Sequence, residues 1–492
     1  MSDANLILLA IAIPALTPFL LALFGRRPDM RDAISVAASI ATFAAVLHLL
    51  LAVVDGARPA ISLIEVMPGL VLGFEIEPLG MLFATVASGL WIPTSLYSIG
   101  YMRGAHEKKQ TRFAICFAIA IAAAIGIAFS ANLFTLFIFY EVLTISTYPL
   151  VAHKETPEAK QGARTYLAIL MTTSILFLLV ALIWTWNITG TTEFRAGGIL
   201  EGNIDPALVP FLLALFAFGI GKAALMPFHR WLPAAMVAPT PVSALLHAVA
   251  VVKAGVFTML KVGTYIFGVG FLSKTGAADW LMWLAAASIL IASIIAITKD
   301  DLKARLAYST VSQLSYITLG VALATQMGIV GGAMHIAMHA MGKIALFMCA
   351  GAIYVAAHKT KISQLDGLGR KMPVTFFCFT IAALSIIGLP PFGGAWSKWY
   401  LMIAAAETSH LIIIGVLMVS SLLNVAYLLP IPARAFFLKP KEDDASSRVE
   451  EAPIFCLLPI CFAAAGCVVL FFTIGSFYEY LLSIPILPES QP

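Results

Sequence analysis

The sequence contains few charged residues. Only 11% of its 492 residues are charged, and its 30 Lys and Arg nearly balance its 26 Asp and Glu. That share is about half of what a soluble domain carries. The net charge of +4 provides no basic face for nucleic acid, and 61% hydrophobic residues exclude a disordered chain and a soluble enzyme. The composition therefore indicates a membrane protein.

The sequence also lacks cysteine motifs. Its six cysteines contain no C-x-x-C pair and lie in or beside apolar runs, where thiols usually pack as small hydrophobic groups. We therefore predict no disulfide, no zinc or other metal site, no iron–sulfur cluster and no cofactor. Asp3 stands where a secretory signal would carry a basic residue, so the N-terminus is not expected to be such a signal.

Long apolar runs separated by short polar joints fill the chain. A membrane-spanning helix needs about 20 apolar residues, and the runs do not alternate as the strands of a membrane barrel do. We therefore predict an all-α polytopic membrane protein. About fourteen spans are expected, at residues 5–25, 33–54, 79–101, 113–130, 132–152, 165–188, 207–229, 241–266, 279–298, 305–325, 329–357, 374–406 (interrupted), 411–437 and 453–483.

Basic residues are unevenly distributed among the joints between these spans. Counted in chain order, the odd joints hold 22 Lys and Arg, and the even joints hold only Arg58, Arg195, Lys274 and, at a helix end, Lys261. Cytoplasmic loops of membrane proteins collect Lys and Arg. We therefore expect the odd joints to be cytoplasmic and both termini to lie on the non-cytoplasmic side.

Five charged residues remain inside the predicted spans: Glu141, Lys222, Lys253, Lys343 and Lys398. Each costs roughly 2.5–3.5 kcal/mol on insertion scales, so the five together cost about 12–17 kcal/mol before pairing and hydration are considered. Packing alone would not select them, and intramembrane ionisable residues usually mark ion pathways. The sequence therefore predicts an internal polar path.

Glu141 and Lys222 are candidates for the first part of this path. Glu141 lies near the middle of its span and is followed by Thr144 and other polar residues, so it is interpreted as a proton-exchanging carboxylate or half of a switching ion pair. Lys222 lies beside Gly221 and before Pro227, which predicts a broken helix with freed backbone groups. The alternative is a static Glu141–Lys222 pair that only locks two helices.

Lys253 is a candidate proton relay because it lies too far from either end of its span to reach water. His247 precedes it by six residues and need not share its face on an ideal helix, so a purely structural role for His247 stays open. His335, His339 and Lys343 recur at four-residue steps on one helix face. That stripe favours a proton wire over a structural network or a metal site, since no acidic or thiol ligand accompanies it.

Lys398 repeats the setting of Lys222, since Pro390, Pro391 and nearby glycines must interrupt its span. Paired broken helices in corresponding positions point to an internal repeat. Because each unit would hold five helices, the second copy would be inverted. The predicted divisions are 1–112 (helices 1–3), 113–266 (first repeat, with broken helix 7), 279–437 (second repeat, with broken helix 12) and 438–492 (a cytoplasmic loop and helix 14).

Three segments carry a family resemblance. Residues 227–233 (PFHRWLP), 238–247 (APTPVSALLH) and 300–313 (DDLKARLAYSTVSQ) resemble the proton-translocating antiporter-like subunits. That family includes the large membrane subunits of respiratory complex I, of membrane-bound hydrogenases and of Mrp-type multisubunit cation/proton antiporters. The resemblance covers essentially the whole chain.

The resemblance implies a role for each of these positions. A helix 5 glutamate pairs with a lysine on broken helix 7, a helix 8 lysine is the central relay, and a helix 11 His/Lys group leads to a charged residue on broken helix 12. These roles fall on Glu141, Lys222, Lys253, His339 with Lys343, and Lys398. His229, His247 and His335 are further possible relay residues.

The resemblance leaves two functions open. The lysine at position 398 and the absence of a long C-terminal extension fit a D-type subunit of an Mrp antiporter, although the 238–247 run looks more like the A and L types. We therefore expect a subunit of a multisubunit antiporter in the cell (inner) membrane that exchanges protons for a monovalent cation, with sodium preferred. The alternative is an N- or M-type proton-pumping subunit of a quinone oxidoreductase or hydrogenase. The chain is expected to have no catalytic site of its own, and a stand-alone solute transporter is disfavoured.

Overall fold

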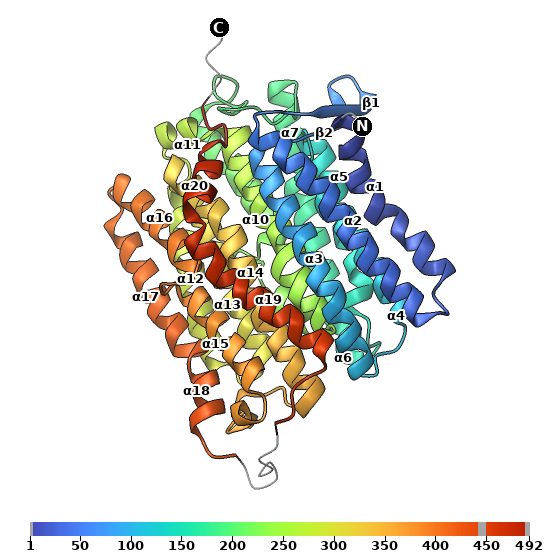
Figure 1. Cartoon of the computed structure of the whole chain (residues 1–492). Helices are drawn as coiled ribbons and strands as arrows, with labels where there is room; N and C mark the ends of the chain where they lie inside the picture. The colour runs from blue at the N-terminus through green and yellow to red at the C-terminus, as the bar shows by residue number, and fades with distance from the viewer. Residues whose placement is uncertain (1–2, 441–448, 488–492) are drawn as a thin grey trace.

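The computed structural model describes residues 3–440 and 449–487, and these residues form a bundle of helices with one small hairpin (Figure 1). Part of the predicted loop before helix 14, residues 441–448, lies outside the described residues. The hairpin, the start of α1 and the end of α20 lie at one end of the bundle, and α18 ends at the opposite end (Figure 1).

The N-terminal part contains a hairpin that sequence analysis did not predict. Its two strands are antiparallel and turn at Gly69, where φ is +80° and glycine is favoured. The Pro68–Gly69 pair was the available signal. The elements are α1 (Asp3–Leu23), α2 (Pro28–Val54), β1 (Ala60–Met67), β2 (Leu70–Glu75) and α3 (Pro78–Gly104).

The next part contains the predicted break around Lys222, which is confirmed: α8 ends at Gly219, and Lys222 lies in a short 3-10 turn. The elements are α4 (Gln110–Ala128), α5 (Leu133–Val151), α6 (Pro157–Thr173), η1 (Ser174–Leu178), α7 (Leu179–Thr189), η2 (Pro206–Leu208), α8 (Val209–Gly219), η3 (Gly221–Ala223), α9 (Trp231–Ala234), η4 (Ala235–Val237), η5 (Val242–Ala250), α10 (Val251–Val262), η6 (Gly263–Phe267) and α11 (Val269–Thr275).

The last part contains the second predicted break, also confirmed: α15 ends at Ile387 and α16 begins at Gly394. The elements are α12 (Asp279–Thr298), α13 (Leu302–Ala322), α14 (Gln326–Ala357), η7 (Ile362–Gln364), η8 (Leu368–Arg370), α15 (Pro373–Ile387), α16 (Gly394–Glu407), α17 (Leu411–Leu428), α18 (Pro430–Phe437), α19 (Ile454–Phe472) and α20 (Ile474–Leu482).

The all-α membrane fold is confirmed. Within residues 3–440 and 449–487, eleven helices are long and apolar enough to cross a membrane. Two shorter apolar helices, Pro206–Gly219 and Pro373–Ile387, each end at one of the breaks. The total of fourteen spans stays a prediction.

Burial places one helical segment at the centre of the bundle. Every residue of Val242–Phe267 in the most apolar window is buried, whereas only 33% of the corresponding windows of α1, α2 and α19 are buried. The segment packs against α13 and α14, and α14 is itself mostly buried. Polar groups on α10 and α14 are therefore enclosed by protein rather than by lipid, which is where charge is tolerated in a membrane.

Candidate functional site

Lys222 lies at the break after α8, where its ammonium group contacts α5. Its Nζ atom donates hydrogen bonds to the Tyr140 carbonyl oxygen at 2.9 Å and to Thr144 Oγ1 at 2.5 Å, and it lies 3.1 Å from the centroid of the Tyr140 ring. The side chain of Trp231 donates to the Gly221 carbonyl that the break leaves free. These contacts replace hydration around a fully buried charge.

Glu141 does not form the ion pair with Lys222 that sequence analysis expected. Both of its carboxylate oxygens are buried, and neither has a hydrogen-bond partner among the described residues. Lys222 instead contacts Tyr140 and Thr144, which lie one residue before and three residues after Glu141 on α5. The two charges still interact electrostatically. The structure therefore brings Glu141 and Lys222 near each other without joining them.

Lys253 on α10 is hydrogen-bonded to His339 on α14. Lys253 Nζ and His339 Nδ1 are 2.6 Å apart, and both residues are almost fully buried. Nearby, Gly255 allows α10 to approach the broken helix closely, because a Cβ atom there would overlap the backbone of Lys222 and Ala223. Helix α10 therefore contacts the broken helix through Gly255 and α14 through Lys253.

His335 continues the line from His339 toward broken helix 12. The two imidazole rings have centroids 5.6 Å apart, and His335 Nδ1 lies 2.8 Å from Ser397 Oγ. The His335 ring also stacks on Tyr316, and Lys398 Nζ lies 5.2 Å from the centroid of that tyrosine. His335 therefore connects the centre of the bundle with the residues around Lys398.

Lys398 lies just after the second break and is hydrogen-bonded to a main-chain carbonyl that the break leaves free. Its Nζ atom donates to the carbonyl oxygen of Ile387, the last residue of α15, at 2.8 Å, and to Ser421 Oγ at 3.1 Å. Lys398 also lines a lateral cavity of about 460 Å³. Lys222 and Lys398 thus occupy similar surroundings, each bonded to a main-chain carbonyl beside an interrupted helix.

Within the described part of the chain, Lys343 on α14 is hydrogen-bonded to α13 rather than to His339 or Lys253. It donates to Ser309 Oγ at 2.6 Å and to the Leu306 carbonyl oxygen at 3.3 Å, and Ser309 is hydrogen-bonded in turn to Tyr427. No hydrogen bond joins Lys343 to His339 among the described residues. The direct line from Lys253 to Lys398 passes through the two histidines instead.

His247 and His229 are not joined to this line. Neither ring nitrogen of His247 has a hydrogen-bond partner among the described residues, and the ring packs beside those of Tyr166 and Trp231. His247 belongs to η5, a π-helical segment, so the angle between His247 and Lys253 differs from that on an ideal α-helix. His229 packs against Tyr308 at the break.

Sequence analysis missed a second group of buried charges. Lys261 was placed at a helix end, but helical structure continues to Phe267, and Lys261 is 1% exposed. Its Nζ atom donates to the Ser130 carbonyl oxygen at 2.6 Å and lies 3.6 Å from Glu77. Its place near the end of an apolar run is typical of an exposed residue, and no local feature of the sequence distinguishes an exposed lysine from a buried one there.

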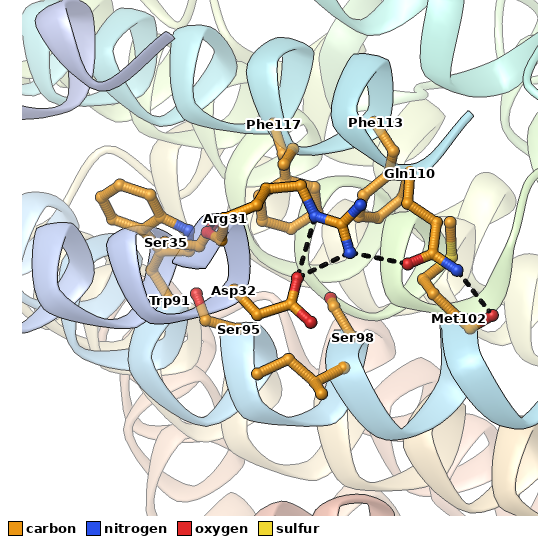
Figure 2. Close-up of a pocket in the computed structure, with 12 residues that line it drawn as sticks. Arg31, Asp32, Ser35, Trp91, Ser95, Ser98, Met102, Gln110, Phe113 and Phe117 are labelled. Carbon is orange, nitrogen blue, oxygen red and sulfur yellow. Dashed lines mark hydrogen bonds and ion pairs between the residues drawn. The ribbon is translucent and has the colours of Figure 1, made fainter. Parts of the chain in front are cut away.

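Another polar pocket lies between α2, α3 and α4. Figure 2 shows Arg31 in this cavity of about 40 Å³, donating hydrogen bonds to Asp32 and to the side chain of Gln110. Asp32 also forms an ion pair with Arg103. The charges in this pocket pair with one another, and none of them contacts the line through Lys253.

Comparison with known proteins gives the family. Residues 130–424 match the model of the family described as NADH:quinone oxidoreductase/Mrp antiporter, transmembrane. The chain is 32% identical to the N subunit of the NADH-quinone oxidoreductase of Desulforudis audaxviator, over 83% of this chain and 82% of that protein. It is 27% identical to the D subunit of the Na(+)/H(+) antiporter of Alkalihalophilus pseudofirmus, over 98% of this chain and 96% of that one.

Longer relatives and solved structures match as well. The chain spans about half the length of several other curated relatives, at 49–51%. A chain in the structure of the Mrp complex from Dietzia sp. DQ12-45-1b has the same fold, with a TM-score of 0.88 at 22% identity, covering 99% of this chain and 97% of that one. The chain therefore belongs to the NADH:quinone oxidoreductase/Mrp antiporter transmembrane family.

Proposed function

We propose that this chain is the proton-translocating subunit of a multisubunit Mrp-type antiporter that exchanges protons for a monovalent cation, with sodium preferred. The observation that carries the proposal is the buried line from Lys253 through His339 and His335 to Ser397 and Lys398. It crosses three helices inside an apolar bundle. Titratable groups so arranged, with no organic-substrate chemistry among them, suit proton transfer.

In this proposal, Glu141 and Lys222 control the line rather than carry the proton. Lys222 lies beside Glu141 without an ion pair, so a small displacement of α5 or η3 would form one and the reverse displacement would release it. A Lys222 charge released from Glu141 would repel a proton held at Lys253, since unit charges interact over several ångströms in a low dielectric. The proton would then pass to His339, His335 and Lys398.

Reconstituted complexes carrying Lys253→Ala test this function. We expect proton-coupled cation exchange to fall at least about 100-fold, the size of a lost proton-transfer group, while the complex still assembles. Lys274→Ala, which removes an exposed Lys–Glu pair, is the matched control and is expected to exchange normally. Wild-type exchange in the Lys253→Ala complex would overturn the proposal.

A redox-driven subunit of the N or M type is the second candidate function. The observation in its favour is the 32% identity to an N subunit of a NADH-quinone oxidoreductase, which exceeds the 27% identity to the D-type antiporter protein. Affinity purification of the tagged protein separates the two. Flavin and iron–sulfur partners support the redox-driven subunit, whereas membrane subunits alone support the antiporter.

The setting of the chain belongs to the same proposal. We place it in the cell (inner) membrane among other membrane subunits, with the hairpin end on the non-cytoplasmic side, as the loop charges predict. Residues 113–266 and 279–437 are proposed as inverted repeats. The similar surroundings of Lys222 and Lys398 at the two breaks support that division.

A further inference from the structure

A cavity of about 450 Å³ lies beside the end of strand β2, and we call it the vestibule. Charged residues from several segments line it: Arg58, Glu75, Glu77, Arg195 and Lys261, with Tyr265 beside them. The Arg195 side chain is 60% exposed and that of Lys261 only 1% exposed. The vestibule therefore extends from exposed residues to a buried ammonium group on α10.

The two carboxylates of the vestibule differ in what they do. Glu77 caps α3 by accepting hydrogen bonds from the backbone of Leu79 and Gly80, and it also accepts one from Tyr265. The Glu75 side chain has no hydrogen bond or ion pair among the described residues. Burial raises the pKa of the Glu75 carboxyl, and the nearby Lys261 charge opposes that rise. Glu75 is thus the carboxylate free to exchange a proton.

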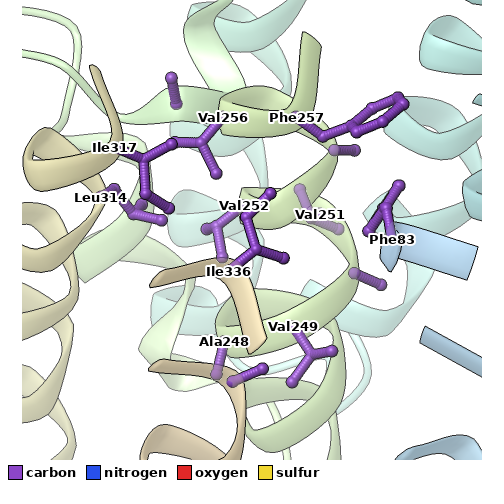
Figure 3. Close-up of a cluster of buried hydrophobic side chains, with 14 of the residues drawn as sticks. Phe83, Ala248, Val249, Val251, Val252, Val256, Phe257, Leu314, Ile317 and Ile336 are labelled. Carbon is purple, nitrogen blue, oxygen red and sulfur yellow. The ribbon is translucent and has the colours of Figure 1, made fainter. Parts of the chain in front are cut away.

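An aromatic layer closes the inner end of the vestibule. Lys261 Nζ lies 4.4 Å from the centroid of the Phe194 ring and 5.6 Å from that of Phe257, and Phe257 stacks on Phe83 with centroids 5.0 Å apart. Figure 3 shows Phe257 among the apolar side chains of the same helix, with Val252 and Val256. Lys253 lies two turns before Lys261 on α10, about 12 Å away along the helix axis.

We propose that the vestibule is a proton port on the non-cytoplasmic side, in which Glu75 takes up a proton from water and Lys261 is the buried acceptor. The proton leaves the Glu75 carboxylic acid, which becomes a carboxylate, and binds the neutral amine of Lys261, which becomes an ammonium ion next to Glu77. The Phe83–Phe257 stack is the barrier between Lys261 and Lys253. This inference rests on the proposed function, because a port has a use only if Lys253 exchanges protons.

The competing explanation is a permanent ion pair that fastens α10 to the start of α3. Lys261 lies 3.6 Å from Glu77, which would suffice for such a pair. A permanent pair does not account for the charged cavity or for Glu75. The remaining charged and titratable groups around the vestibule are Arg58, Arg195, Glu193 and Tyr480, and none of them is changed in the variants below.

Lys261→Arg and Lys261→Met separate the two explanations in the reconstituted complex. Arginine keeps the positive charge beside Glu77 but does not release its proton in proteins. A port predicts that both variants lose at least tenfold in proton-coupled exchange. Full exchange in Lys261→Arg, with loss only in Lys261→Met, would overturn the port and support the permanent pair. If Lys261→Met fails to assemble, Lys261→Arg alone decides.

Glu75→Gln tests the outer acceptor, with Glu65→Gln as its matched control on the exposed strand β1. We expect exchange in Glu75→Gln to fall severalfold and to lose its dependence on the pH of the non-cytoplasmic side only. Glu65→Gln should retain both the rate and the dependence. Equal behaviour of the two variants would overturn the role of Glu75.

Infrared titration of the purified complex separates this inference from the proposed function. A carboxyl band that titrates above the range of exposed carboxyl groups should be present in the wild type and in Glu65→Gln, and absent in Glu75→Gln. The band can be measured in a complex that exchanges no cations. An unaltered band in Glu75→Gln would overturn the port, whereas wild-type exchange in Lys253→Ala would overturn the relay.

Discussion

Lys253 Nζ lies 2.6 Å from His339 Nδ1, so two titratable bases on different helices share one hydrogen bond. A lysine ammonium can only donate, so His339 Nδ1 accepts when Lys253 is charged. The other ring nitrogen of His339, Nε2, has no partner among the described residues. A proton received at Nδ1 can therefore leave from Nε2, and the imidazole carries it from one side of the ring to the other.

Replacement of His339 by glutamine should stop this transfer. Glutamine is polar but does not titrate, so we expect proton-coupled exchange to fall about 100-fold, with normal assembly of the complex. His48→Gln, on the exposed face of α2, is the control and should exchange normally. Wild-type exchange in the His339→Gln complex would show that protons reach Lys398 by another route.

Proton exchange should depend on the hydroxyl group of Ser397 rather than on the size of its side chain. Ser397→Ala leaves Nδ1 of the buried His335 without a partner, which costs about 1–3 kcal/mol of folding stability. We expect proton exchange to fall about tenfold in Ser397→Ala, about a 1.4 kcal/mol rise in the barrier, and to recover in Ser397→Thr, which keeps the hydroxyl. Stopped-flow measurement of vesicle pH distinguishes the two. Equal rates in both variants would remove Ser397 from the path.

A methyl group at Gly255 should push α10 away from the broken helix. In Gly255→Ala the new Cβ atom would overlap the backbone at Lys222, and overpacking of this kind costs about 1–3 kcal/mol. Thermal unfolding of the purified protein should show the loss. Gly270→Ala, where no atom lies within 4 Å of the added carbon, should keep the wild-type melting temperature or raise it. A Gly255→Ala protein as stable as Gly270→Ala would contradict the close approach.

His153, just after α5, should make stability depend on pH. Burial first, and the nearby Arg112 charge second, lower its pKa from 6.5 to about 4. Because the folded-state pKa is the lower one, the stabilisation is complete above pH 6.5 and is lost as pH falls to about 4. The loss is on the order of 2 kcal/mol after allowance for solvent screening.

Unfolding of the purified protein between about pH 6.5 and about pH 4.5 measures this effect. His153→Gln should flatten the dependence in that range. Glu155→Gln should leave it in place. Hydrogen bonds first from Lys109 and then from Arg112 lower the pKa of Glu155 from 4.5 to about 2, below this range, and the Glu155 charge opposes the fall in the pKa of His153. An unchanged pH dependence in His153→Gln would assign the effect to other groups.

The central residues could be predicted from sequence because a charge inside an apolar run is visible without any structure. Lys222, Lys253 and Lys398 were found in this way, and the prolines beside two of them predicted the breaks that α8 and α15 show. The contact between Lys253 and His339 could not be predicted, since it depends on how α10 packs against α14. Spacing on one helix likewise favoured Lys343, whereas a neighbouring helix takes its ammonium group to Ser309.

Lys261 and the hairpin were missed for different reasons. A lysine near the end of an apolar run looks exposed unless the helix is known to continue past it, as η6 does here. The strands of residues 60–75 are short and mixed in character, and membrane spans on both sides gave a stronger signal. The expected Glu141–Lys222 pair depends on which side of α5 the lysine approaches, and sequence does not encode that choice locally.

Two hydrogen bonds of the line join three separate helices: Lys253–His339 connects α10 with α14, and His335–Ser397 connects α14 with α16. Protein hydrogen bonds have donor–acceptor distances of about 2.7–3.2 Å, and a contact at about 3.6 Å is no longer one. A sliding motion of about one ångström between two of these helices would therefore break a bond of the line without changing any residue. Partner subunits that touch only the outer helices would then govern the proton current mechanically, through the spacing of the bundle. Mutations on the lipid-facing surface, far from every titratable group, would then lower the rate of proton exchange.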